Sequence, residues 1–291
     1  MKRCLLLINK ISGNCSRAMN NPDVYNTLRK AYDVVDTLYI EENSPVDIKR
    51  NISGYDALAV CGGDGTFNNA INSIRDKKLD FIYIPCGTLN DTAKTLQLTS
   101  KLRDENRSIR RVDIGEIGGT LFSYVAAAGS FTAIGYKTNI KMKKKIKVLA
   151  YLFEVLREYK VHHIKAKIQT ENSCHEGVYT LIMAINSQRC FGFNFNKMYD
   201  HRSGKAHLLL IKAPKGKGLL SMIKMFFPFF RAFFIGFKKP YKSKNIVFEE
   251  FSQAKVRLED VRTFTIDGEK IDMKGEFDIN IHKQKIKLYV Y

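Results

Sequence analysis

Two glycine-rich turns that each carry a carboxylate stand in the first third of the chain. They read Cys61-Gly62-Gly63-Asp64-Gly65-Thr66 and Pro85-Cys86-Gly87-Thr88-Leu89-Asn90-Asp91, and each follows a short apolar run. Each also precedes a helix-like stretch, which begins at Phe67 or at Thr92. Glycines let the backbone approach a ligand closely, and free N–H groups at a helix start attract anions. The pattern predicts a phosphate-binding site formed at two strand ends.

Phosphoryl transfer also needs a divalent cation and a base near the acceptor hydroxyl, and carboxylates supply both. Asp64 is one candidate, and Asp113, between Val112 and Ile114, is a second. The third is Asp267, in the run Thr265-Ile266-Asp267-Gly268-Glu269 at the end of an expected strand. Asp-Gly between alternating runs is also a strong hairpin signal, and Asp113 fits a loop cap equally well. The residues alone leave catalysis and turn formation both open.

The elements that must position these residues are of two kinds. The first third alternates strands (4–9, 34–40, 55–60 and 81–84) with helices (16–32 and 46–52), which predicts a parallel sheet covered by helices on both faces. Ligands bind at the carboxyl ends of such strands. After about residue 110, short β-like runs predict a sandwich-like β domain. These runs are 120–127, 163–169, 178–186, 206–212, 245–248, 255–258, 263–266, 277–282 and 286–291, with helices at 147–159 and 218–236.

Composition narrows the function classes. The 291 residues carry 48 Lys and Arg against 29 Asp and Glu, a net charge of +19, which favours an anionic partner. The six cysteines form no Cys-x-x-Cys pair, so we expect reduced thiols, with Cys61 and Cys86 as small packing residues. No apolar stretch is long enough to span a membrane, and the histidines do not fall at zinc-ligand spacings.

The two turns resemble the hallmarks of the diacylglycerol kinase catalytic domain family, most closely its small bacterial lipid kinases. NAD kinases share the first hallmark, whereas the second is more specific to lipid kinases. The loop Asn9-Lys10-Ile11-Ser12-Gly13 is similar to the family's Asn-Pro-x-Ser-Gly nucleotide loop. The resemblance covers nearly the whole chain. It implies an α/β nucleotide domain (1–118), a β-rich domain (119–291) that carries the base and the lipid site, and an active site in the cleft between them.

The resemblance also implies roles for individual residues. Asp267 would take the proton from the lipid hydroxyl, Glu269 would help hold Mg²⁺ or the phosphates, and Asp64 and Asp113 would complete an acidic network. Thr66 and Thr88 are expected to cap helices and to donate hydroxyls to phosphates. The residues expected to bind ATP are Asn9, Lys10, Ile11, Ser12, Gly13, Gly62, Gly63, Asp64, Gly65, Thr66, Phe67, Asn68, Gly87, Thr88, Asn90 and Asp91, and Asp64 with Glu269 are the expected catalytic Mg²⁺ ligands.

Two positions depart from the family. Relatives with a structural Mg²⁺ carry an aspartate where this chain has Ser203, so a metal at Asp200, Ser203 and Lys205 is in doubt. Ile40 stands where relatives often have a nucleotide-contacting threonine.

Residues 222–239 are dense in phenylalanine and edged with lysine, and they interrupt their helix at Pro228. A buried helix and a segment lying in lipid headgroups explain them equally well. The lysine run 141–147 is a second basic patch. We expect an ATP- and Mg²⁺-dependent lipid kinase of the cytoplasm, peripherally bound to the inner, anionic membrane face, with a membrane lipid as substrate and no nucleic acid partner. A homodimer stays open, as do a NAD-kinase-like enzyme with a soluble substrate and a non-catalytic lipid- or nucleotide-binding protein.

Overall fold

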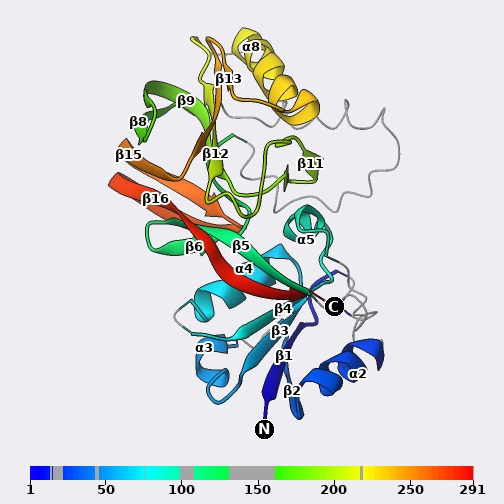
Figure 1. The fold of residues 1–291 in the computed structure, drawn as a ribbon. Helices are drawn as coiled ribbons and strands as arrows, with labels where there is room; N and C mark the ends of the chain where they lie inside the picture. Colours follow the sequence, from blue (N-terminus) through cyan, green and yellow to red (C-terminus); the bar gives the residue numbers. More distant parts are fainter. Residues whose placement is uncertain are drawn as a thin grey trace.

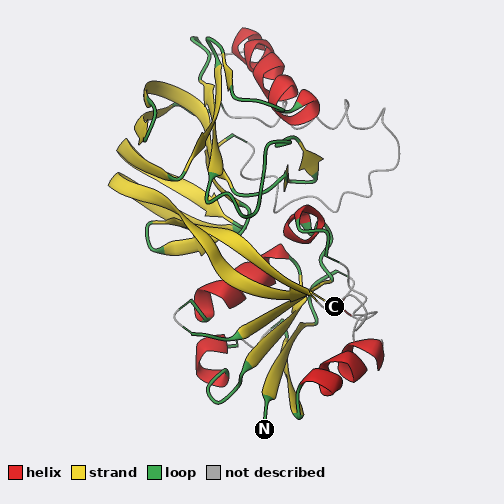
Figure 2. Cartoon of the chain, viewed as in Figure 1, coloured by secondary structure: helices red, strands yellow, loops and turns green. Residues whose placement is uncertain are grey.

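The computed structural model describes residues 1–13, 15, 22–42, 46–75, 77–98, 108–130, 161–216 and 219–290, which are drawn in colour in Figure 1 and by element type in Figure 2. The expected helix at 147–159, the lysine run 141–147 and residues 16–21 of the expected helix 16–32 lie outside these residues.

The first part of the chain forms the predicted parallel sheet. Its strands are ordered β4-β3-β1-β2. Residues alternate between its two faces: Leu5 and Leu7 pack with α3 and α4, while Leu6 and Ile8 pack with α2. The sheet is therefore buried on both sides, as its continuous apolar strands require. The elements are β1 (Arg3–Asn9), α2 (Pro22–Ala31), β2 (Val34–Ile40), α3 (Ile48–Asn51), β3 (Ala57–Gly62), α4 (Asp64–Ser73), β4 (Asp80–Pro85) and α5 (Asp91–Thr95).

The second part is rich in antiparallel strands, as expected. Its sheet path runs β13-β14-β12-β9-β7-β15-β16, and β8 pairs with both β9 and β15. The elements are β5 (Ser108–Ile117), β6 (Thr120–Phe122), β7 (Val125–Gly129), β8 (Ile164–Thr170), β9 (Cys174–Ile185), β10 (Arg189–Cys190), β11 (Phe193–Asn194), β12 (Ala206–Lys212), α8 (Leu219–Phe230), η2 (Arg231–Ile235), β13 (Tyr241–Lys242), β14 (Ile246–Phe251), β15 (Gln253–Ile266) and β16 (Glu269–Val290).

One long strand, β16, joins the two parts. It pairs with β15 and β5 and then reaches the first sheet, where Leu288 lies beside Phe81 of β4. The separate strands expected at 277–282 and 286–291 are wrong, because both belong to β16; the register shifts between His282 and Ile286, and such an irregularity bends a strand without ending it. The runs 255–258 and 263–266 likewise belong to the single strand β15.

The phenylalanine-rich segment has two different faces. Met225, Phe229 and Phe233 are buried in the core beneath it, whereas Phe227 is 67% exposed. The expected interruption at Pro228 is wrong: α8 continues through Pro228 and widens into the π-helix η2 from Arg231. Loosened turns of this kind accommodate a helix whose hydrogen-bond ladder is disturbed. Among the described residues, no helix is long and apolar enough to span a bilayer.

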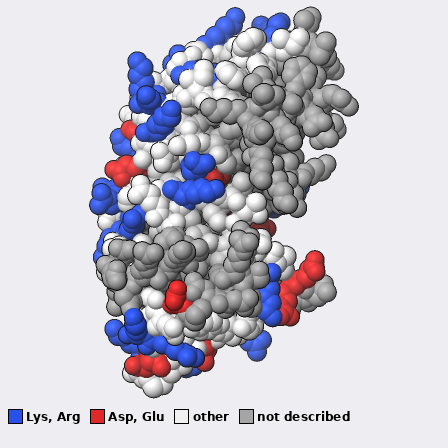
Figure 3. All heavy atoms as spheres, turned by 90° about the vertical axis from the view of Figure 1, so that its right-hand side faces the viewer, with Lys and Arg blue, Asp and Glu red and all other residues white. Residues whose placement is uncertain are grey.

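On one face of the described part of the molecule, positive charge is scattered and not concentrated in a single patch (Figure 3). Figure 3 shows lysine and arginine side chains scattered over one face, with fewer acidic groups between them. Such a distribution suits general attraction to an anionic surface more than readout of a specific ligand.

Candidate active site

The two glycine turns pack directly against each other, backbone to backbone. A Cβ on Gly87 would lie 2.6 Å from Gly63 Cα, and one on Gly63 would lie 3.2 Å from Gly87 Cα. The Cys86 N–H donates to Gly62 O (2.8 Å). Side chains at these glycines would push the turns apart, so the glycines are required by this close approach. The turns form one continuous backbone surface at the carboxyl ends of β3 and β4.

The loop after β1 joins the same surface. Asn9 Nδ2 donates to Thr66 Oγ1 (2.8 Å), while Asn9 Oδ1 accepts from the Ile11 N–H (3.0 Å). A Cβ on Gly13 would lie 3.1 Å from Thr88 Oγ1. Lys10 instead points outward and forms an ion pair with Glu41 (2.6 Å). All three predicted phosphate-binding segments therefore meet in space.

Asp64 links the two turns by capping the second helix. Its carboxylate accepts from the N–H groups of Asp91 (2.9 Å) and Thr92 (3.0 Å), the first residues of α5. Burial of this carboxylate and the charge of nearby Asp91 raise the pKa of Asp64 to about 6. The caps expected from Thr66 and Thr88 are wrong, because Thr66 lies inside the first turn of α4 and the α5 N-cap, Asn90, follows Thr88 by two residues.

Two of the expected nucleotide contacts are occupied elsewhere. Phe67 is fully buried and packs on Phe81 and Tyr83, at ring-centroid distances of 5.3 and 4.5 Å. Phe67 is the fourth residue of α4 and turns its ring into the core, so its contact with ATP stays a prediction. Asp91 is also buried and accepts from the Gly192 N–H (2.8 Å), so it ties α5 to the β10–β11 segment.

Asp267 occupies the hairpin between β15 and β16. Its φ of 47° and that of Gly268, 108°, form the tight turn that the Asp-Gly pair predicts. The carboxylate accepts from Val125 N (2.8 Å), from Tyr124 N (3.1 Å) and from both the N–H and the hydroxyl (2.6 Å) of Ser123. Burial outweighs these hydrogen bonds and raises the pKa of Asp267 to about 7. Asp267 therefore forms the predicted hairpin turn and also provides a buried carboxylate with a raised pKa, so the two interpretations of this residue are compatible.

Two polar contacts connect Asp267 to the glycine turns. Ser123 Oγ donates a hydrogen bond to Asp267 and lies 3.3 Å from Thr92 Oγ1. The backbone N–H of Thr92 in turn donates to Asp64. The side-chain amide of Asn68 in α4 satisfies its hydrogen-bond partners when its nitrogen faces Asp267, and that nitrogen then lies 3.2 Å from Asp267 Oδ2. Residues from the first turn, the second turn and the hairpin thus form one connected polar group.

Asp113 has a different position. It is buried, and its two carboxylate oxygens accept from the backbone N–H groups of Gly204 (2.6 Å) and Gln284 (2.7 Å). These bonds clamp β5 to the loop before β12 and to the irregular step in β16, in keeping with the capping alternative. Glu269, at the start of β16, is exposed.

The doubtful structural-metal loop is held by its own hydrogen bonds. Asp200 Oδ1 accepts from Arg202 N (3.0 Å), Ser203 Oγ accepts from Lys205 N (3.1 Å), and Lys205 forms an ion pair with Glu250 (3.1 Å). Within the described ranges, the only group of three or more His, Cys, Asp or Glu side chains close enough to share a metal ion is Cys15, Cys61 and Cys86.

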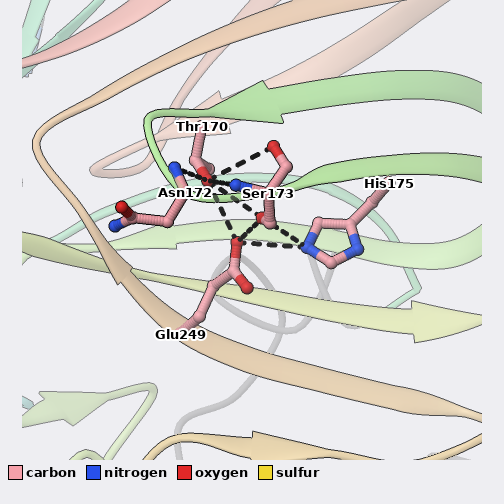
Figure 4. A network of polar contacts seen from close by, with 5 residues as sticks. All are labelled: Thr170, Asn172, Ser173, His175 and Glu249. Atoms are coloured by element: carbon pink, nitrogen blue, oxygen red, sulfur yellow. Dashed lines mark hydrogen bonds and ion pairs between the residues drawn. The ribbon is translucent and has the colours of Figure 1, made fainter.

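A second polar network, in the β-rich part, is a structural tie. Ser173 Oγ (2.8 Å) and Glu249 Oε1 (3.1 Å) both contact Nε2 of His175, and Thr170 joins them (Figure 4). A serine–histidine–acid triad would use the two opposite ring nitrogens. Because both partners contact the same nitrogen, the group holds the β8–β9 hairpin to β14 and does not form a nucleophile.

Sequence reasoning missed Thr92 and Ser123. Thr92 directly follows the second hallmark, so its place at the helix start could have been anticipated. Ser123 lies in the run Leu121-Phe122-Ser123-Tyr124-Val125, where no local pattern distinguishes it. Its position follows only from the pairing of β7 with β15.

Comparison with known proteins gives a consistent result. Residues 3–118 match the diacylglycerol kinase catalytic domain family. The chain is 30% identical to a diacylglycerol kinase of Staphylococcus saprophyticus over 203 residues, covering 65% of this chain and 67% of the relative. It is 28% identical to a diacylglycerol kinase of Staphylococcus haemolyticus over 233 residues, covering 74% and 68%. A crystal structure of a diacylglycerol kinase from Bacillus anthracis has the same fold, with a TM-score of 0.69 at 17% identity over 100% of this chain and 97% of that one.

Proposed function

Because this chain belongs to the diacylglycerol kinase catalytic domain family and is a lipid kinase, we propose that it transfers the γ-phosphate of ATP to a hydroxyl of a diacylglycerol-like membrane lipid. ATP lies across the joined turns around Gly63 and Gly87, and the loop 9–13 closes one side. Residues 1–118 form the nucleotide-binding domain, and residues 119–291 supply the base and the lipid site.

The crowded carboxylates fit a divalent cation beside the phosphates. Desolvation of the half-buried Asp64 carboxylate and the charge of nearby Asp91 raise the pKa of Asp64, and a cation relieves such repulsion. Mg²⁺ commonly uses one or two protein carboxylates and takes its other ligands from phosphates and water. Asp64, with the exposed Glu269 at the start of β16, would hold it, and the ion would neutralise charge on the transferred phosphoryl group.

Asp267 acts as the general base in this proposal. Its carboxylate takes the proton of the lipid hydroxyl, the hydroxyl oxygen forms the new bond to the γ-phosphorus, and the bond from that phosphorus to ADP breaks. A base is most effective when its pKa lies near the working pH, and the pKa of Asp267 is raised to about 7. The observation that carries the assignment is the connection from Asp267 through Ser123 to Thr92 at the phosphate-binding helix start.

We also propose that the outer face of α8 and η2 docks on an anionic membrane. Ile223, Phe227 and Ile235 are 50%, 67% and 54% exposed on this segment, and Lys224, Lys238 and Lys239 are exposed around them. The segment lies at the end of the molecule opposite β1 and β2 (Figure 1). Exposed bulky apolar groups flanked by lysines suit a headgroup layer of negative charge.

Transfer of label from [γ-³²P]ATP tests the kinase proposal, and vesicle binding tests the docking proposal. We expect labelled lipid from diacylglycerol in anionic vesicles, and no labelled product from NAD. Replacing Ile223 and Phe227 by Ser removes two side chains worth about 1.5–3 kcal/mol each when inserted, so vesicle binding should fall at least about 100-fold. Activity on detergent-dispersed lipid should be unchanged, because these side chains lie outside the core.

Phe229→Ser is the matched control on the inner face of the same helix. It should lower the melting temperature, because a large-to-small change in a core costs about 3–5 kcal/mol. Label in NAD and not in lipid would favour the soluble-substrate alternative. Unchanged vesicle binding by the folded double variant would exclude this docking face while leaving the lipid kinase assignment intact.

A further inference from the structure

Three cysteines from separate parts of the sequence meet directly beneath the phosphate-binding turns. Cys61 belongs to the end of β3, Cys86 follows β4, and Cys15 follows the loop after β1. The Sγ atoms of Cys61 and Cys86 are 2.8 Å apart, those of Cys15 and Cys61 are 3.7 Å apart, and all three lie within 4.8 Å of one another. Their residues are 0–3% exposed. The proposed kinase chemistry uses none of these thiols.

We propose that these three thiols form a binding site for a soft, thiophilic cation of the Zn²⁺, Cd²⁺ or Cu⁺ class. Thiolate sulfur selects such ions over Mg²⁺. A zinc–sulfur distance of about 2.3 Å in tetrahedral geometry places ligand sulfurs about 3.8 Å apart. This spacing is close to the 3.7 Å between Cys15 and Cys61 and longer than the 2.8 Å between Cys61 and Cys86. A small side-chain movement that separates Cys61 from Cys86 brings these two sulfurs to the same spacing.

Without an ion, the surroundings favour one thiolate and not three. Hydrogen bonds with Cys61, and then with Cys86, lower the pKa of the Cys15 thiol, whereas hydrogen bonds with Cys15 raise the pKa of Cys61 and of Cys86. Apolar residues of the first sheet and α2, among them Leu6, Ile8 and Leu28, close the site from below. Three thiolates cannot stay charged together in such a setting without a cation, so binding releases protons as the ion enters.

The position gives the site a consequence for the kinase. The ligands come from the three segments that form the phosphate-binding surface, next to Gly13, Gly62 and Gly87. A bound ion fixes these segments to one another, whereas without the ion only the contacts of the turns hold them. The cation therefore stabilises the phosphate-binding half of the molecule, independently of which lipid or nucleotide the enzyme uses.

Cadmium titration of the full-length, reduced protein without oxygen tests the site. We expect about one Cd²⁺ per chain, a new ultraviolet sulfur-to-cadmium charge-transfer band and a higher melting temperature. Cys61→Ala and Cys86→Ala should each weaken Cd²⁺ binding by about 100-fold or more, because even indirect partners of a metal site are worth 10- to 100-fold. Cys4→Ala, a buried cysteine of the same sheet, is the matched control and should bind like the parent.

Each other outcome counts against the proposal. Absence of the band in the folded parent overturns it, and so does full binding by the folded Cys86→Ala variant. Thiol counting in denaturant covers the remaining case: a Cys61–Cys86 disulfide that persists after reduction would replace the cation site by a covalent link. Melting curves of each variant without metal show whether lost binding reflects lost folding.

Discussion

Asp267→Asn should lower the rate of lipid phosphorylation by about 10²–10⁴-fold, the usual cost of losing a general base. Asparagine is the right replacement, because residue 267 has a φ of 47° and asparagine tolerates this left-handed conformation. The amide cannot accept from all the donors of Ser123, Tyr124 and Val125, so we also expect a loss of stability of about 1–3 kcal/mol. Turnover on dispersed lipid and ATP affinity are the measurements.

The matched control is Asp272→Asn on the same hairpin. Asp272 is exposed and accepts from Thr263 Oγ1 (2.6 Å), so its neutralisation should leave turnover within twofold of the parent. ATP affinity should be nearly unchanged in both variants. If Asp267→Asn retains more than half of the parent's turnover, Asp267 is a turn residue and not the base.

Asp64→Ala should nearly abolish activity and raise the Mg²⁺ concentration required. Loss of one electrostatic contact to a transition state lowers the rate by about 10²–10³-fold. The first two N–H groups of α5 also lose the carboxylate that accepts their hydrogen bonds, which costs about 0.5–2 kcal/mol of stability. Titration of Mg²⁺ at fixed ATP measures the first effect, and thermal melting measures the second.

Two further variants separate charge from capping. Asp64→Asn keeps an oxygen for one α5 N–H, so it should be more stable than the alanine variant and almost as inactive. Asp47→Ala removes the α3 N-cap, which accepts from Arg50 N (3.0 Å), and should cost stability without changing the Mg²⁺ dependence. An Asp64→Ala enzyme with the parent's rate and Mg²⁺ dependence would leave Asp64 a capping residue only.

The sequence predicts local features of this molecule well. Short continuous apolar runs mark the strands of the first sheet, the glycine turns mark the strand ends, and the Asp-Gly pair marks the β15–β16 hairpin. These features depend on neighbouring residues, so local patterns carry them. The long strands β15 and β16 were divided in the prediction because their irregular steps interrupt the apolar alternation without ending the pairing.

Features that depend on distant contacts could not be predicted. Asp64 caps a helix 27 residues away, Ser123 reaches Asp267 across 144 residues, and Asp113 accepts from Gly204 and Gln284. Cys15, Cys61 and Cys86 show no metal-binding spacing because they come from three different strand ends. The buried and exposed faces of the phenylalanine-rich segment also could not be predicted, because they depend on the sheet beneath it.

The pH dependence of turnover in the parent and in Ser123→Ala tests the role of Asp267 most directly. Only the ionised carboxylate accepts the proton, so parent activity should fall about tenfold per pH unit below an apparent pKa of about 7. The Ser123 hydroxyl stabilises the ionised form, and its removal should shift this fall to higher pH while preserving the plateau. Protonation of the nucleotide or of the lipid affects both enzymes equally, so it does not contribute to the difference between their pH profiles. Superimposable profiles, or a parent rate that stays constant from pH 6 to 8, would contradict Asp267 as the base.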